Sequence, residues 1–127
     1  PSITDLTGTT GIITQNGGTG DLNIPGYKGY VLYKITSSHE AWIRVFVDDA
    51  SRQADDTRSE GTDPSPGGGV VAEVRTSGLN QSVLVTPGVM GFNNDNPRTN
   101  NIYLSVTNRS GSSTAITVTL TVLQTGE

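Results

Sequence analysis

The amino-acid sequence predicts an all-β fold, an antiparallel β-sandwich of about six to eight short strands with an extended N-terminal arm. The chain is rich in Thr, Ser, Asn and Gly, with 16 glycines, and this composition favours strands joined by tight turns over long helices. Apolar and polar residues alternate in several short runs, and Gly-, Pro- or Asn-rich segments separate these runs. The length of 127 residues suits a single domain.

The N-terminal segment has the least regular pattern. Residues 1–26 scatter short apolar pairs among many Gly and Thr residues and show no sustained period. We therefore expect an arm over residues 1–26, followed by the sandwich over residues 27–127. A Gly-rich terminus of this kind is either a disordered leader or a strap that becomes ordered against a neighbouring subunit.

The first two core strands are expected over residues 30–36 and 41–48, with the short break SSHE between them. In the second strand, one face carries Ala41, Ile43, Val45 and Val47, and the other carries Trp42, Arg44 and Phe46. Both of its faces are largely apolar, so we expect both to contact protein and the strand to be central.

A breaker segment with two prolines and three consecutive glycines, EGTDPSPGGG, follows over residues 60–69. Four more strands are then expected, over residues 70–77, 81–88, 101–108 and 114–124. In the last of these, alternate residues from Ile116 to Val122 are apolar and threonines lie between them. This pattern indicates a strand that buries one face and exposes hydroxyl groups on the other.

Charge and composition exclude several function classes. The net charge is −4 and the eight basic residues are scattered, so a nucleic-acid partner is not expected. No apolar run is long enough to span a membrane, and the first residues lack the charged and apolar regions of a secretion signal. We therefore expect that the protein is synthesised in the cytoplasm and does not associate with a membrane. The absence of cysteine excludes thiol catalysis, zinc–thiolate sites and disulfides, and no cofactor is predicted.

The charged stretch DDASRQADDTR, residues 48–58, is the most prominent candidate site. Half of the 12 acidic residues lie within residues 48–63. A calcium site is one hypothesis, but the spacing lacks the D-x-[DN]-x-[DN]-G pattern. The favoured interpretation is structural ion pairing on a helix-like turn. The residues assigned to these pairs are Asp48, Asp49, Arg52, Asp55, Asp56 and Arg58.

His39, the single histidine, lies between Ser37-Ser38 and Glu40, which raises the hypothesis of a hydrolytic Ser-His-Glu group. Adjacent residues point in different directions, and no motif supplies an oxyanion hole. A turn histidine is the favoured interpretation.

Aromatic residues are the remaining candidates. Carbohydrate-binding β domains commonly stack sugars on aromatic rings, but Trp42 lies in the most apolar strand, which favours a core or subunit-interface role. The residues assigned to a possible interface or glycan contact are Trp42, Tyr27, Tyr30, Tyr33 and Tyr103.

Residues 27–124 resemble a small β-domain that recurs in virion structural proteins of tailed bacteriophages, of the capsid decoration, head-fibre or tail-tip type. The segments that carry the resemblance are Ala41–Val45, the turn with Arg52, Asp55 and Arg58, Thr62–Pro64, Thr86–Gly88, Gly91–Asn93 and Val106–Asn108. None of these segments is a catalytic motif.

The resemblance implies a non-enzymatic virion structural protein. We expect a capsid decoration or cement protein that forms homo-oligomers and binds other virion proteins, such as major capsid or tail proteins. The alternative is a tail-tip or fibre domain that binds host-surface glycan through its aromatic residues or through loop 93–101. A depolymerase would require two carboxylates that face one cleft, and residues 48–63 are the one segment that offers them.

Overall fold

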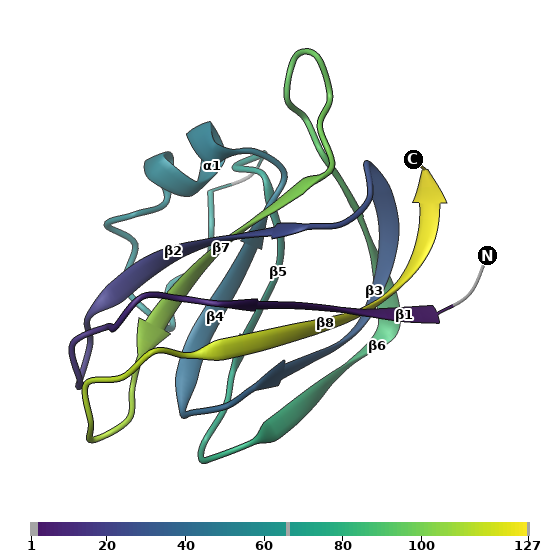
Figure 1. The fold of residues 1–127 in the computed structure, drawn as a ribbon. Coiled ribbons are helices and arrows are strands. Elements are labelled where there is room, and N and C mark those ends of the chain that lie inside the picture. The colour runs from purple at the N-terminus through teal and green to yellow at the C-terminus, as the bar shows by residue number, and fades with distance from the viewer. Residues whose placement is uncertain (1–2, 66, 127) are drawn as a thin grey trace.

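The computed structural model of the chain describes residues 3–65 and 67–126. Within this part of the chain, eight strands and one short helix form a two-layered sandwich (Figure 1). The elements are β1 (Ile3–Thr9), β2 (Thr19–Pro25), β3 (Gly29–Ser37), β4 (Ala41–Phe46), α1 (Asp49–Ala54), β5 (Val70–Arg75), β6 (Gln81–Phe92), β7 (Asn101–Asn108) and β8 (Thr117–Gly126). The predicted all-β sandwich is confirmed.

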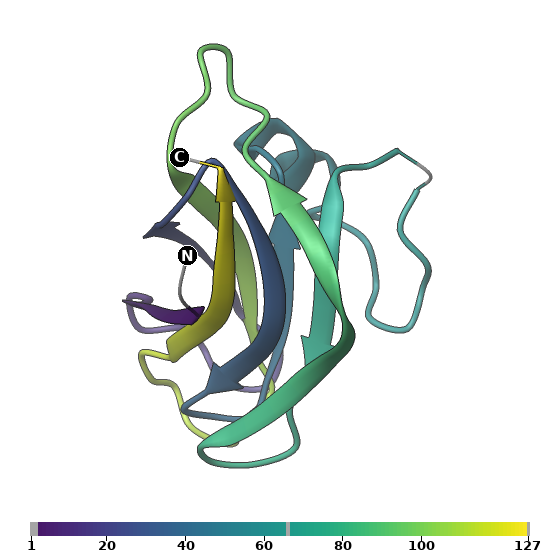
Figure 2. The same cartoon turned by 90° about the vertical axis from the view of Figure 1, so that its right-hand side faces the viewer.

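The eight strands form two sheets of four strands each. Sheet I has the order β1-β8-β3-β6 and sheet II has the order β2-β7-β4-β5, and every pairing is antiparallel. Of the connections between consecutive strands, only β4 to β5 stays within one sheet. All the others cross from one sheet to the other, which is the arrangement of a double-sheet jelly roll. Figure 2 shows β8, β3 and β6 of sheet I side by side at the front of the view.

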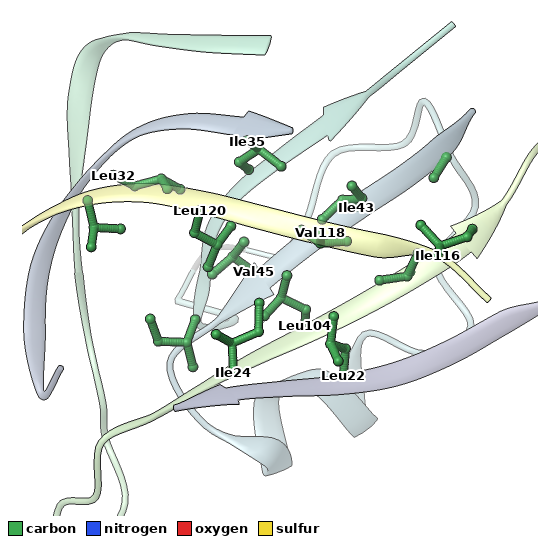
Figure 3. Packing of buried hydrophobic residues seen from close by; sticks show 14 of the residues in the cluster. Leu22, Ile24, Leu32, Ile35, Ile43, Val45, Leu104, Ile116, Val118 and Leu120 are labelled. Carbon is green, nitrogen blue, oxygen red and sulfur yellow. The ribbon is translucent and has the colours of Figure 1, made fainter. Parts of the chain in front are cut away.

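The core lies between the two sheets and consists mainly of aliphatic side chains (Figure 3). Leu32, Ile35 and Leu120 from sheet I face Ile43 and Leu104 from sheet II, and all five are fully buried. Burial of apolar surface is the main stabilising term available to this cysteine-free chain.

Strand β8 alternates as the sequence predicts. Val118, Leu120 and Val122 are fully buried, whereas the threonines between them lie on the outer face of sheet I. The hydroxyl of Thr119 bonds to that of Thr7 on β1 at 3.0 Å. This face is therefore polar, in contrast to the core face.

Residues 3–25 are part of the sandwich, which corrects the predicted N-terminal arm. Strand β1 pairs with β8 in sheet I, and β2 pairs with β7 in sheet II. The weak periodicity has a physical cause, since glycines occupy inward-facing positions. A Cβ on Gly8 would lie 2.9 Å from Ile24, and a Cβ on Gly20 would lie 3.0 Å from Ile13, so neighbouring side chains fill these positions.

Strand β6 is longer than the sequence predicts, because it continues beyond Gly88 to Phe92. Its first half pairs with β3 as far as Leu84, and pairing resumes at Val89. Residues 85–88, which include the Thr86-Pro87-Gly88 sequence, lie opposite the single β3 residue Tyr33. The Pro-Gly pair thus produces an irregularity within the strand rather than its end.

Candidate functional site

The outer face of sheet II carries most of the charged side chains discussed above. Trp42, Arg44 and Phe46 project from this face of the central strand β4, and all three are buried. Helix α1 lies against this sheet (Figure 1), and Arg58 and Glu60 of the segment after the helix lie near Trp42. The prediction that both faces of β4 contact protein is confirmed.

Helix α1 begins with a side-chain cap. Asp48 is the N-cap residue, and its Oδ1 accepts a hydrogen bond from the backbone N–H of Ser51 at 2.8 Å. This hydrogen bond is the leading cause that lowers the pKa of Asp48. Asp48 therefore acts as a helix cap, and among the described residues it takes part in no ion pair.

Arg52 fastens α1 to sheet II. Its guanidinium donates to Asp49 Oδ1 from Nε at 3.0 Å and from Nη2 at 2.6 Å. Its Nη1 donates to the side chain of Asn23 on β2 at 2.7 Å and to the Leu104 carbonyl on β7 at 3.2 Å. The guanidinium carbon also lies 5.1 Å from the centre of the Tyr103 ring. A short helix that would not be stable alone is thus held to two strands.

Asp55 lies between two arginines. Arg44 Nη1 donates to the Asp55 carbonyl at 2.8 Å and to its Oδ2 at 3.1 Å. Arg58 donates to both carboxylate oxygens, from Nε at 2.8 Å and from Nη2 at 3.0 Å. Burial raises the pKa of the Asp55 carboxyl, but the hydrogen bonds and charges of the two arginines outweigh it and leave the pKa below its usual value.

A second group of ion pairs surrounds Glu60. Its two carboxylate oxygens accept hydrogen bonds from Arg75 at 2.6 Å and from Arg109 at 2.8 Å. Burial raises the pKa of Glu60, and the two guanidiniums lower it by a larger amount. Arg75 also pairs with Glu40, and Arg58 pairs with Glu73 on β5. These pairs connect loop 55–63 to β5 and to the residue after β7.

The structure therefore places the predicted charged residues as follows. Asp49 pairs with Arg52 and Asp55 pairs with Arg58, while Asp48 caps the helix and Asp56 is exposed with no ion pair in the described part of the chain. Within residues 3–65 and 67–126, no three acidic or histidine side chains come together in a way that could hold a metal ion. The geometry of this stretch is that of a structural brace.

His39 is not arranged as part of a hydrolytic group. Its Nδ1 bonds to the Ser38 hydroxyl at 2.8 Å, but Ser37 donates to the His39 carbonyl at 2.7 Å. The Glu40 carboxylate accepts from Arg75 instead of orienting the imidazole. The three groups do not form the base-and-orienter chain of a serine hydrolase.

The five aromatic candidates do not form an exposed platform. Trp42, Tyr30 and Tyr103 are buried, and Tyr30 belongs to the core between the sheets. Tyr27 and Tyr33 are half-buried on different parts of the fold. Sugar stacking, the alternative to a core or interface role, is not supported at the three buried rings, because a stacking platform must be accessible to its ligand.

A polar cleft of about 390 Å³ opens beside Trp42, and we call it the arginine cleft. It lies between the outer face of sheet II and the segment after α1. Residues that line it include Trp42, Arg44, Arg58, Glu60, Thr107 and Arg109. Arg44 was expected on the same face as Trp42 but not as a site residue. A charged residue in an otherwise apolar strand is the sequence signal that could have identified it.

The long loop between β6 and β7 projects from one end of the sandwich (Figure 1). The buried side chain of Asn93 holds it, with Oδ1 accepting from the backbone N–H groups of Asp95 at 2.9 Å and Thr99 at 3.0 Å. The Asn93 amide donates to the Thr99 hydroxyl and the Asn101 carbonyl, both at 2.9 Å. The Asn-rich loop is thus tied together by its own side chains.

Comparison of the chain with protein-family models, with curated proteins and with solved structures finds no match. The described residues also contain no helix of the length and apolar character required to cross a membrane.

Proposed function

We propose that this protein is a non-enzymatic virion structural protein, a capsid decoration or cement protein that acts through subunit–subunit contacts. The resemblance of residues 27–124 to virion β-domains supports a role as a virion component. The jelly-roll arrangement is compatible with it, since this architecture occurs in viral capsid domains as well as in lectins.

The observation that carries the proposal is the edge strand β6. It is the outermost strand of sheet I, paired on one side with β3, and none of its twelve residues is charged. Natural edge strands usually carry charged residues or bulges that prevent pairing with another chain. Here the irregularity at residues 85–88 interrupts the edge, but Leu84 before it and Met90 and Phe92 after it are apolar and exposed.

Three large apolar side chains of β6 are exposed. Leu84 is 71% exposed, Met90 is 72% exposed and Phe92 is 46% exposed. Met90 and Phe92 border an apolar groove of about 470 Å³ between the edges of the two sheets, where Val70 and Val71 of β5 form the other side. Exposed apolar and aromatic side chains beside a groove are typical of a protein contact surface.

The favoured occupant of this surface is a second copy of the chain. A net charge of −4 opposes self-association over most of the surface, whereas the uncharged β6 strand allows two copies to approach without like charges facing each other.

Light scattering tests this proposal through the mass of the purified protein in solution. We expect an oligomer for the wild type and a lower mass for Met90→Lys. Ile12→Lys is the matched control, because Ile12 is also exposed and apolar but lies in the β1–β2 connection, away from β6. Co-sedimentation with phage capsids that lack minor proteins then tests the cement role. A wild-type monomer that also fails to bind capsids would contradict the proposal.

The alternative is a tail-tip or fibre domain that binds glycan. The feature that supports it is the arginine cleft rather than the aromatic residues. The arginine cleft is a polar cavity of ligand size.

A further inference from the structure

Arg44, one of the residues that line the arginine cleft, is an incompletely paired buried cation. The Arg44 side chain is 1% exposed, and its guanidinium carbon lies 4.1 Å from the centre of the Trp42 ring. Nη1 makes both hydrogen bonds to Asp55. Among the described residues, the buried Nε has no hydrogen-bond partner, and no residue accepts a hydrogen bond from Nη2.

An unpaired buried N–H group is costly, so each one in a native protein calls for an explanation, and a bound ligand or water is one such explanation. The Nε and Nη2 groups of an arginine form one edge of a planar fork that matches the two oxygens of a carboxylate. The same protein shows this geometry nearby, where the Nε and Nη2 groups of Arg58 donate to the two oxygens of Asp55. The Nε–Nη2 edge of Arg44 has the same chemistry, and no carboxylate among the described residues accepts from it.

The walls of the cleft are suited to hydroxyl groups. Thr107 and Thr19 lie side by side on β7 and β2, with their hydroxyl oxygens 2.9 Å apart. The exposed Asp56 carboxylate lines the opposite side and has no ion-pair partner among the described residues. Arg109 uses Nε to bind Glu60, and its remaining nitrogens provide further donors at the rim.

We propose that the arginine cleft binds a carboxylated sugar, with the sugar carboxylate on the Nε–Nη2 edge of Arg44. The sugar hydroxyls bond to Asp56, Arg109 and the paired threonines. The volume of about 390 Å³ lies in the range of small-ligand sites. The polar walls favour a hydroxyl-rich ligand over an apolar peptide. This inference is independent of the virion role, since a carboxylated sugar could be recognised by a protein in any location.

Trp42 provides the measurement, because it is the only tryptophan in the chain and it stacks on Arg44. We titrate the wild-type protein with glucuronate and follow the emission of Trp42. Glucose is the matched control ligand, because it has a hydroxymethyl group where glucuronate has the carboxylate. We expect saturable binding of glucuronate that is at least 10-fold tighter than that of glucose, since hydrogen bonds to a charged group are the stronger ones.

Two further ligands separate a sugar site from a general anion site. Acetate and inorganic phosphate are expected to bind at least 10-fold more weakly than glucuronate, because they cannot reach the hydroxyl-binding walls. Equal binding of acetate or phosphate would overturn the assignment to a sugar. Equal binding of glucose and glucuronate, or no change in emission with either, would overturn the role of Arg44.

A variant tests the position of the ligand. Arg44→Lys keeps the positive charge but removes the planar fork, so we expect glucuronate binding to weaken at least 10-fold. Because this buried substitution can also disturb the fold, Asp56→Ala serves as a second variant at an exposed position. We expect Asp56→Ala to weaken both glucuronate and glucose binding. Unchanged affinity for glucuronate in both variants would place any binding elsewhere.

Discussion

Arg44 is bound to Asp55 by two hydrogen bonds from one nitrogen, at 2.8 Å to the carbonyl and 3.1 Å to the carboxylate. These bonds join the central strand of sheet II to the first residue after helix α1. The Arg44 and Asp55 side chains are 1% and 11% exposed, so the pair is shielded from water. Breaking this pair is therefore expected to lower the free energy of unfolding by more than breaking an exposed ion pair would.

Asp55→Asn is expected to destabilise the protein by about 3 kcal/mol, because it leaves the buried charge of Arg44 without its anion and also weakens the pairing with Arg58. Urea denaturation monitored by Trp42 emission measures the effect. Asp56→Asn is the matched control, since Asp56 is exposed, and we expect a change within about 0.5 kcal/mol. Equal effects of the two substitutions would contradict the bracing role of Asp55.

The stability of the protein is expected to fall in acid. The pKa values of Asp55 and Glu60 are lowered in the folded state, so these carboxylates contribute stability that is fully present above their unfolded pKa values, near 4. That contribution is lost as the pH falls below about 4 and the groups take up protons. Urea midpoints at pH 7, 5 and 3 measure this dependence. Asp55→Asn should show a smaller drop between pH 5 and pH 3 than the wild type, and an equal drop would contradict the assignment.

Tyr30→Phe is expected to preserve or increase stability by up to about 1 kcal/mol. The Tyr30 hydroxyl is buried and has no hydrogen-bond partner among the described residues, and burial raises its pKa. Removing an unsatisfied polar atom eliminates its desolvation cost while the ring keeps its packing. Thermal unfolding measures the effect. A clear loss of stability would show that the hydroxyl makes a hydrogen bond in the native protein.

Gly91→Ala is expected to cost about 2 kcal/mol, because an added Cβ would lie 2.3 Å from Cζ of the buried Tyr30 ring. The ring can yield only by displacing core side chains. Gly111→Ala is the control, since a Cβ there would meet no atom within 4 Å. Thermal unfolding of the two variants compares them directly, and equal midpoints would indicate that the ring moves without cost.

Asn93→Asp is expected to loosen loop 93–101. The substitution removes the amide donors to Thr99 and Asn101 and places a carboxylate beside Asp95, whose Oδ2 accepts from Asn93 at 3.1 Å. Trypsin cleavage after Arg98 reports the order of the loop, and we expect the variant to be cut at least several-fold faster. Asn96→Asp introduces the same charge at an exposed position and is expected to remain resistant. Equal cleavage rates would show that Asn93 does not hold the loop.

Sequence patterns predicted the strands that have an uninterrupted alternation. Strand β8 could be recognised because its inward positions are all large and apolar, and β4 because apolar residues occupy both of its faces. Strand β2 was missed because Gly20 occupies an inward position where Ile13 supplies the side chain. Its periodicity is completed by a residue from another segment, which no local window contains.

The contacts of the candidate site can also be divided into those that local sequence spacing predicted and those that it did not. Arg52 pairs with Asp49, and Arg58 pairs with Asp55. In each pair the two residues are three positions apart in the sequence, so their spacing alone suggested the pairing. The pairs of Arg109 and Arg75 with Glu60 join residues far apart in the chain, and only the folded structure brings them together. The burial of Trp42 likewise depends on the segment after α1 that covers it.

The sequence by itself determined that this protein is an all-β sandwich, that it has no thiol chemistry, and that its acidic stretch is matched by arginines. These properties follow from composition and local spacing. The tertiary structure alone decided which strands share a sheet, that β6 is an uncharged edge with exposed apolar side chains, and that the buried Nε of Arg44 has no hydrogen-bond partner among the described residues. The physical reason is that burial and hydrogen-bond satisfaction depend on residues that are distant in sequence.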